Sequence, residues 1–231
     1  MDVIKNFNPK MYNAFYIIRK GLYNSIKDNI ALFKGKMLDF GCGCKPYKDL
    51  FINVDEYIGL DYYNEGHPHD NEFIDIFYDG KTIPFDNNTF DCILSSEVFE
   101  HIFNINEIMN ELSRVLKKGG IILITCPFAW NLHEIPNDYA RYTPFALIDI
   151  FQKNGFEVLK VEKIGNYITA LGQLKILYFT NYILPKLGVL NNKYFASFII
   201  LSYNIKIKIK SIILPNKSDF YLNNLIVAKK I

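Results

Sequence analysis

The sequence predicts an α/β fold: an open, mostly parallel sheet of seven strands with helices on both faces. Two observations lead to this prediction. Seven short apolar runs are spread along the chain, and helix-like amphipathic segments separate most of them. The first run, 36–40, also leads directly into Gly41 and Gly43, as in loops where a strand turns tightly beside a ligand. In such sheets, ligands bind at the carboxyl ends of the strands.

The seven expected strands are short and rich in Ile, Leu, Val and Phe. They are expected at 36–40, 56–61, 72–77, 90–96, 120–128, 156–164 and 220–230.

Three helices are expected between them. Apolar residues at helical spacing predict the first helix over 9–33, closed by Gly35. The second is expected over 105–120, where Lys-Lys-Gly-Gly is a stop signal. Thr143, followed by Pro144, is a favourable N-cap for the third helix, which ends near Gly155.

The segment 165–218 interrupts this alternation between the last two strands. It is rich in Ile, Leu, Tyr and Phe, and its charged residues are lysines. Its longest apolar run, 194–203, is about half of what a membrane span needs. The strict alternation over 205–210 predicts either an edge strand or a segment lying on a surface. We therefore expect one domain, 1–231, with a helical insert that contacts an anionic membrane peripherally or forms a homodimer.

Composition restricts the class of protein. The 231 residues are 50% hydrophobic, so disorder is not expected, and four cysteines show no disulfide or zinc pattern. The first ten residues lack the apolar core of a signal peptide, so a cytoplasmic setting is expected. The net charge of +2 divides unevenly, with +9 over 160–231 and −7 over the rest. Nucleic acid is not the expected substrate, because the lysines alternate with aliphatic residues.

The glycine loop predicts a nucleoside site. Asp39 ends the first strand, and Asp61 ends the second, eighteen residues after Gly43. A carboxylate at that place can accept hydrogen bonds from both hydroxyls of a ribose. A dinucleotide loop usually keeps a third glycine near its pyrophosphate, but Lys45 stands there. A nucleoside ligand without a phosphate fits the loop better; an ordinary strand–helix turn is the alternative.

The stretch LDFGCGCKPY, 38–47, resembles the first motif of the Rossmann-like S-adenosylmethionine (SAM)-dependent methyltransferases, and more narrowly the type 11 methyltransferase domain. The resemblance continues through YIGLD, the stretch from DGKTIPF to EVFEHI, LSRVLKKGGIILITCPF and HEIPNDYARYT, and covers roughly 37–156. It implies a Rossmann-like sheet with an antiparallel last strand and SAM as cofactor. It also implies cofactor contacts, with the methionine end of SAM at Asp39 and the Gly41, Cys42 and Gly43 backbone, and the ribose at Asp61. The adenine is expected near the segment from Asp75 to Asp79, with either acid as a candidate contact, and the methyl group is expected to face Ser96 and Glu97.

A second group of polar residues follows the fourth strand. If a helix begins near Ser96, then Glu97, Glu100 and His101 share one of its faces. This arrangement suits a proton-transfer site or a divalent metal. It is similar to the segment that binds Mg²⁺ in ubiquinone-pathway and small-RNA 2′-O-methyltransferases. His133, after the fifth strand, is a further candidate base, and the alternative for Glu100 is a role in holding the loop.

The stretch 133–145 supplies candidate acceptor contacts: Asp138, Tyr139, Arg141 and Tyr142. The alternative is a loop pinned by an Arg141–Asp138 pair. His67 and His69 lie in a turn-rich segment and are expected to be solvated.

Taken with the resemblance, these residues predict an enzyme that moves a methyl group from SAM to a small molecule, with oxygen as the preferred acceptor atom. A hydroxyl of a sugar or of a lipid-linked cell-surface glycan intermediate is the expected acceptor. The rivals are an NAD-dependent enzyme on a similar sheet and a degenerate SAM-binding or membrane-docking subunit.

Overall fold

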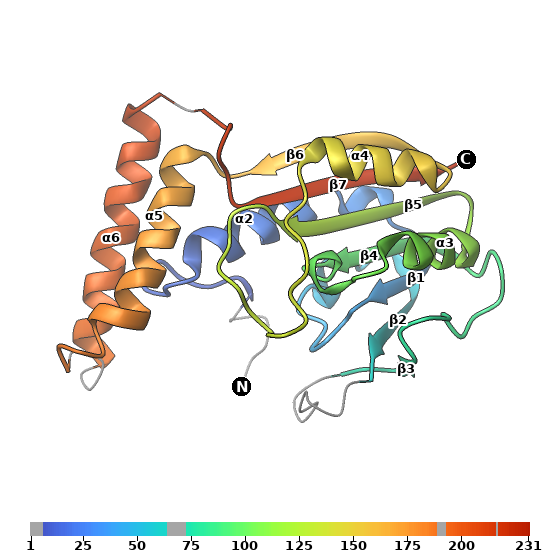
Figure 1. Ribbon diagram of the computed structural model, residues 1–231, viewed down its shortest axis with the longest axis horizontal. Coiled ribbons are helices and arrows are strands. Elements are labelled where there is room, and N and C mark those ends of the chain that lie inside the picture. Colours follow the sequence, from blue (N-terminus) through green and yellow to red (C-terminus); the bar gives the residue numbers. More distant parts are fainter. Residues whose placement is uncertain (1–6, 64–72, 189–192, 216) are drawn as a thin grey trace. The chain divides into compact units, whose positions relative to one another are not determined.

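A computed structural model describes residues 7–63, 73–188, 193–215 and 217–231 (Figure 1). His67 and His69 lie outside these residues. The predicted seven-stranded sheet is confirmed, with the strand order β3-β2-β1-β4-β5-β7-β6. The pairs β1–β2, β1–β4, β2–β3 and β4–β5 are parallel, and the last strands run antiparallel. The strands are β1 (Gly35–Phe40), β2 (Val54–Tyr62), β3 (Ile76–Tyr78), β4 (Phe90–Ser96), β5 (Leu116–Pro127), β6 (Phe156–Ile164) and β7 (Asn223–Lys230).

The helices match the predicted positions less closely. They are α2 (Tyr16–Lys27), α3 (Ile105–Val115), α4 (Pro144–Lys153), α5 (Tyr167–Tyr178) and α6 (Lys193–Ile213). The first helix begins at Tyr16, well after the predicted start at residue 9. Asn13 explains the delay, because its side chain accepts a hydrogen bond from the Phe15 N–H at 2.8 Å and so competes with helical pairing. The N-cap prediction is confirmed: Thr143 Oγ1 accepts from the Ala146 N–H.

Two predicted boundaries are wrong. The helix expected over 105–120 ends at Val115, and β5 begins at once, because Leu116 is fully buried and pairs with Phe90. Lys117, Lys118, Gly119 and Gly120 therefore belong to the strand. The register shifts between Phe90 and Cys92, and Gly119 adopts a positive φ of 79° at this irregularity.

The alternating segment 205–210 is not an edge strand, since it lies within α6. Ile207 is the one buried side chain among these six. Gly172 in α5 permits this burial, because a Cβ there would lie 2.7 Å from two carbons of Ile207. Tertiary packing thus overrides the period-two pattern.

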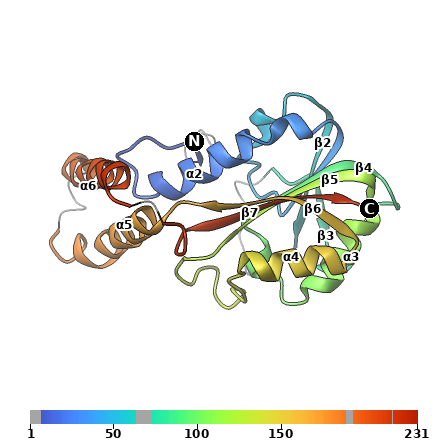
Figure 2. The ribbon, with the colours of Figure 1, turned by 90° about the horizontal axis from the view of Figure 1, so that it is seen from above.

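Helices α3 and α4 cover the same face of the sheet (Figure 2). Their buried side chains join the strand residues in one apolar cluster; from the helices these are Ile108, Met109, Leu112, Val115, Leu147 and Phe151. Phe99, from the turn after β4, is fully buried in this cluster, with its ring 6.4 Å from that of Phe151. Burial of Phe99 anchors the turn that carries Glu100 and His101.

The chain divides into two compact units. One consists of Ile26–Glu162 and Asn224–Ile231, and it holds every candidate site residue. The other consists of Met1–Ser25 and Lys163–Asn223. In the second unit α5 and α6 lie side by side (Figures 1 and 2), and the π-helical turn Phe179–Ile183 continues α5. The expected helical character of the segment 165–218 is therefore confirmed for these described elements. Among the described helices, none has both the length and the apolarity to cross a membrane.

Candidate active site

The candidate residues gather at the carboxyl ends of β1 and β4. These strands are neighbours in the sheet, while the chain continues from β1 to β2 on one side and from β4 to β5 on the other. This is the topological switch point, where parallel sheets bind their ligands. The order of the strands therefore places the glycine loop and the Glu100 segment at one edge of the sheet.

Gly41 occupies a position that only glycine fits. Its φ is +72°, and an added Cβ would lie 2.3 Å from a methyl carbon of Val98. The N–H groups of Gly41 and Cys42 donate to the Leu60 carbonyl at 2.8 and 3.2 Å, which fixes the loop to the end of β2. The backbone can therefore approach a ligand closely at this turn.

Asp61 contacts the same loop. Its Oδ2 accepts a hydrogen bond from the Gly43 N–H at 2.7 Å, and its Oδ1 accepts from the Tyr62 N–H at 2.7 Å. The loop and the acid thus form one site, as their spacing predicts. A carboxylate beside a tight glycine turn fits the ribose of a nucleoside cofactor.

Lys45 stands where a dinucleotide loop has its third glycine, and it also has the backbone conformation of a glycine. It has a glycine-like φ of +51°, and its buried side chain forms an ion pair with Asp75. Asp75 also accepts from the Gly59 N–H at 2.7 Å. Burial opposes the ionised form of Asp75, but the bonds from Gly59 and Lys45 outweigh it and lower its pKa. Asp75 therefore holds the loop, and its expected contact with adenine stays a prediction.

Asp39 is almost completely buried, and the Tyr57 hydroxyl donates to its Oδ2 at 2.5 Å. The pKa of Asp39 is raised to about 7, mainly by burial, with the Tyr57 bond opposing this rise and the nearby Asp61 adding to it. Burial also raises the pKa of the Cys42 thiol, which argues against Cys42 as a nucleophile.

The helix expected to begin near Ser96 does not form. Ser96 ends β4, and its Oγ lies 2.9 Å from Thr125 Oγ1. Glu97 has a φ of +58°, and its N–H donates to the Thr125 carbonyl, so it continues the pairing with β5. A single 3₁₀ turn, Phe99–His101, follows. The prediction that Glu97, Glu100 and His101 share a helix face is therefore wrong.

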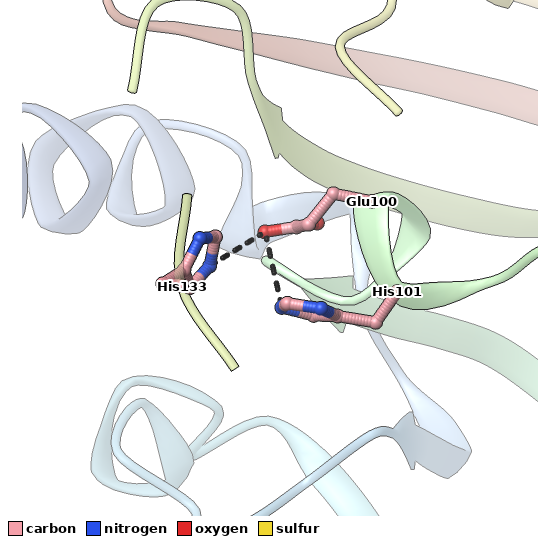
Figure 3. Close-up of side chains that lie close together, drawn as sticks. All are labelled: Glu100, His101 and His133. Carbon is pink, nitrogen blue, oxygen red and sulfur yellow. Dashed lines mark ion pairs between the residues drawn. The ribbon is translucent and has the colours of Figure 1, made fainter. Parts of the chain in front are cut away.

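The structure brings together a different trio: Glu100, His101 and His133 (Figure 3). Glu100 is fully buried, and its Oε1 lies 3.8 Å from His101 Nε2 and 3.7 Å from His133 Nε2. The two imidazole rings are 4.7 Å apart in an edge-to-face arrangement. The three side chains point toward one another from the turn after β4 and the loop after β5.

The second ring nitrogen of each histidine lies near an oxygen atom. His101 Nδ1 lies 2.7 Å from the Asn137 carbonyl, which can only accept, so this nitrogen carries a proton and Nε2 of the neutral ring has a lone pair. His133 Nδ1 lies 3.3 Å from Asp138 Oδ2. The neighbouring Glu100 is the main cause that raises the pKa of His133.

The loop that carries His133 is fastened to this cluster. The N–H groups of Tyr139 and Ala140 donate to the Glu100 carbonyl at 2.8 and 3.2 Å. Arg141 forms a two-bonded pair with Asp138, at 2.5 and 2.8 Å, and this pair lowers the pKa of Asp138. The pinned loop, weighed as the alternative for this stretch, is therefore present.

A hollow of about 370 Å³ lies on this loop and adjoins the acceptor residues expected there. Its lining comprises Trp130, Asn131, Leu132, Asp138, Tyr139, Ala140 and Arg141. Tyr142 lies outside that lining; it is partly buried, and its carbonyl accepts from Asn224. Three residues of the site could not be predicted from the sequence, because nothing near an isolated aromatic or amide residue in the chain indicates its partners: Trp130, Tyr57 and Asn137.

The trio is also a possible metal site, since one ligand atom from each residue lies within 4.8 Å of the others. Two imidazole nitrogens and one carboxylate oxygen suit a borderline metal such as zinc or iron, whereas Mg²⁺ prefers oxygen ligands. The prediction from the sequence is that these residues bind no metal, with an Mg²⁺ group of Glu97, Glu100 and His101 as the alternative. This alternative is not supported, because Glu97 lies outside the 3₁₀ turn Phe99–His101.

Comparison with known proteins gives the family. Residues 38–124 match the model of a methyltransferase domain. These residues form a Rossmann-like SAM-dependent methyltransferase domain. Among curated proteins, this methyltransferase is 29% identical over 193 residues to a ubiquinone biosynthesis O-methyltransferase of Pelagibacter ubique, covering 69% of this chain and 77% of the relative. An uncharacterized protein of Methanocaldococcus jannaschii is 33% identical over 79 residues, 33% of this chain and only 35% of that protein.

Solved structures share the fold of this methyltransferase. The [4+2]-cyclase SpnF superposes with a TM-score of 0.58 at 16% identity, covering 92% of this chain and 81% of the cyclase. Phosphoethanolamine N-methyltransferase 2 of Haemonchus contortus, in complex with SAM, gives 0.55 at 18% identity, covering 98% of this chain and 60% of that one. A cyclase among the neighbours shows that the sheet alone does not determine the reaction.

Proposed function

We propose that this methyltransferase transfers the methyl group of SAM to a hydroxyl oxygen of a small-molecule acceptor, with His101 as the general base. The observation that carries the proposal is the orientation of His101. Its Nδ1–H points to the Asn137 carbonyl, so the lone pair of the neutral ring is on Nε2, which lies 3.8 Å from Glu100 Oε1 and 3.7 Å from Glu134 Oε2. The likeness to a ubiquinone biosynthesis O-methyltransferase agrees with oxygen as the acceptor atom.

The cofactor residues in this proposal are those of the glycine loop and its neighbours. SAM, when bound, supplies a methyl group on a sulfonium, which is a good leaving group. Asp61 would hold the ribose hydroxyls, and Asp39 with the 41–43 backbone would hold the methionine end. Ser96 and Glu97 would lie on the side of the methyl group. The protein's contribution to the reaction is therefore to align the acceptor with the methyl group and to exclude water.

His101 and Glu100 then act on the acceptor proton. An alcohol must lose its proton as the new bond to carbon forms, and His101 Nε2 takes it. The Glu100 oxygen at 3.8 Å stabilises the resulting imidazolium, an effect strengthened because Glu100 is fully buried. His133, 3.7 Å from the same oxygen, is the second candidate base.

The acceptor is proposed to enter over the 131–141 loop. The hollow there has aromatic walls from Trp130 and Tyr139 and polar groups from Asn131 and Arg141. This mixture suits a molecule with an apolar part and several hydroxyls, such as a sugar or a lipid-linked glycan intermediate. A cytoplasmic setting is part of this proposal and agrees with the described cysteines, which form no disulfide.

The test uses His101→Asn, which keeps a donor near the Asn137 carbonyl and removes Nε2. Transfer of labelled methyl groups from SAM to a glycan and glycolipid extract should fall by about 10²–10⁴-fold, while SAM affinity in calorimetry stays unchanged. His133→Asn is the matched control and should cost less. A His101→Asn enzyme with normal turnover would reject the base assignment.

Two further measurements separate the remaining alternatives. A transition metal bound to the trio predicts loss of activity in EDTA and its recovery with zinc or iron, whereas a simple base predicts no effect of EDTA. Calorimetry with SAM and with NAD distinguishes the methyltransferase from an NAD-dependent enzyme. Binding of SAM without any transfer would favour the degenerate SAM-binding subunit.

A further inference from the structure

Helix α6 exposes a continuous apolar face. At 3.6 residues per turn, five of its large side chains fall on one side, and we refer to them as the outer stripe: Tyr194, Phe198, Ile205, Ile209 and Ile212. All five are classed as exposed, from 42% for Ile205 to 89% for Tyr194. Single exposed apolar residues are normal on a protein surface, but an aligned row of five marks an interaction site.

The opposite face of α6 is already occupied by this chain. Ile207 packs against Gly172 of α5, and the ring of Tyr203 lies 5.3 Å from that of Phe179. Asn204 is buried and donates to the carbonyls of Met11 and Asn13 at 2.6 and 3.1 Å. These contacts set the rotation of α6, so the outer stripe is held outward.

Positive charge borders the stripe. Lys206 and Lys210 fall along one side of it and Lys208 along the other, and all three are exposed. The unit that contains α6, Met1–Ser25 with Lys163–Asn223, has twelve Lys and Arg residues but only two acids, a net charge of +10. The other unit therefore carries −8, because the whole chain carries +2.

We propose that the outer stripe of α6 binds the surface of an anionic phospholipid bilayer. The apolar side chains enter the boundary between headgroups and acyl chains, and the flanking lysines reach the anionic headgroups with their stems along the apolar layer. Tyr194 and Phe198 are aromatic residues of the kind that favour this depth. The helix lies on the membrane and does not cross it. This inference does not depend on the identity of the methyl acceptor.

Charge decides between a bilayer and a second copy of the chain. In a two-fold symmetric dimer the same patch meets itself, so the interface would contain the lysines of both copies: Lys206, Lys208 and Lys210 twice over. The segment 163–218 contains no acidic residue that could neutralise them. An anionic bilayer supplies both an apolar layer and negative charge, and so complements both features of the helix.

The test is flotation of the full-length protein with vesicles of phosphatidylcholine alone and with vesicles that also contain phosphatidylglycerol. Binding should require the anionic lipid and should weaken as salt is raised. Phe198→Gln with Ile209→Gln, both on the exposed face, should reduce partitioning by at least about tenfold. Lys206→Gln, Lys208→Gln and Lys210→Gln together should reduce it by about 100-fold at low salt, since each lysine is worth about fivefold.

The matched control removes three exposed lysines from the other unit: Lys34→Gln, Lys118→Gln and Lys153→Gln. It changes the net charge equally and should leave partitioning nearly unchanged. An equal loss in the control, or equal binding to phosphatidylcholine alone, would overturn the proposal. So would a protein that ignores anionic vesicles and instead forms a dimer in light scattering that the Phe198 and Ile209 variant abolishes.

Discussion

Replacing Asp39 with Asn should change how the stability of this methyltransferase depends on pH. Asp39 is buried, and its pKa of about 7 lies well above the ordinary value of 3.8. Asn has nearly the same shape, accepts the hydrogen bond from Tyr57 through its amide oxygen, and has no charge at any pH. The variant thus removes the titration while keeping the contact.

The pKa difference sets the size and sign of the effect. The folded protein keeps the Asp39 proton up to about pH 7, whereas the unfolded chain releases it near pH 4, so the folded state binds more protons between these values. The free energy of unfolding therefore falls as pH rises through this window. A difference of about 3 pKa units corresponds to roughly 4 kcal/mol in total. About half of it, roughly 2 kcal/mol, should be lost between about pH 5.5 and about pH 8.5.

Urea unfolding followed by circular dichroism measures this change. Relative to Asp39→Asn, the wild-type protein should lose about 2 kcal/mol across that range. Asp91→Asn is the control, because contacts with Lys117 and the Lys36 N–H outweigh burial and lower the pKa of Asp91. Asp91 is thus ionised in both states throughout the range and should add no pH dependence. Parallel stability curves for wild type and Asp39→Asn would refute the assignment of a buried, protonated Asp39.

Two further substitutions test the cofactor loop. Asp61→Ala should weaken SAM binding in calorimetry by at least about tenfold, because charge-assisted hydrogen bonds of roughly 1.5–3 kcal/mol are lost. An unchanged affinity for SAM would show that Asp61 does not contact the cofactor. Gly41→Ala places a methyl group 2.3 Å from a Val98 carbon at a φ of +72°, so about 1–3 kcal/mol of stability should be lost in chemical denaturation. Adding Val98→Ala should restore part of this loss, and a Gly41→Ala protein of normal stability would show that the loop is not tightly packed.

Local signals in the sequence determined much of this protein. The apolar runs of β1, β2 and β4, the N-cap at Thr143, and the spacing between Gly43 and Asp61 each depend on residues close together in the chain. They could be predicted because a strand pattern, a cap or a strand–loop–strand unit is specified by its own residues. The family resemblance added the cofactor, since several such signals occur in a familiar order.

Tertiary structure alone decided the rest of the site. Helical spacing placed Glu97 beside Glu100, but pairing of the Glu97 N–H with Thr125 and burial of Phe99 replace that helix with a single turn. His133 is 33 residues from Glu100 in the chain, and only the loop after β5 brings it within 3.7 Å.

The same holds for the partners of Lys45 and Asn204. Lys45 pairs with Asp75, thirty residues away, and Asn204 with the Met11 carbonyl, 193 residues away. The residues next to a side chain in the sequence do not indicate which distant residue it will pair with. They are selected when the whole chain folds, because a buried polar group must find a hydrogen-bond partner wherever the packed chain provides one.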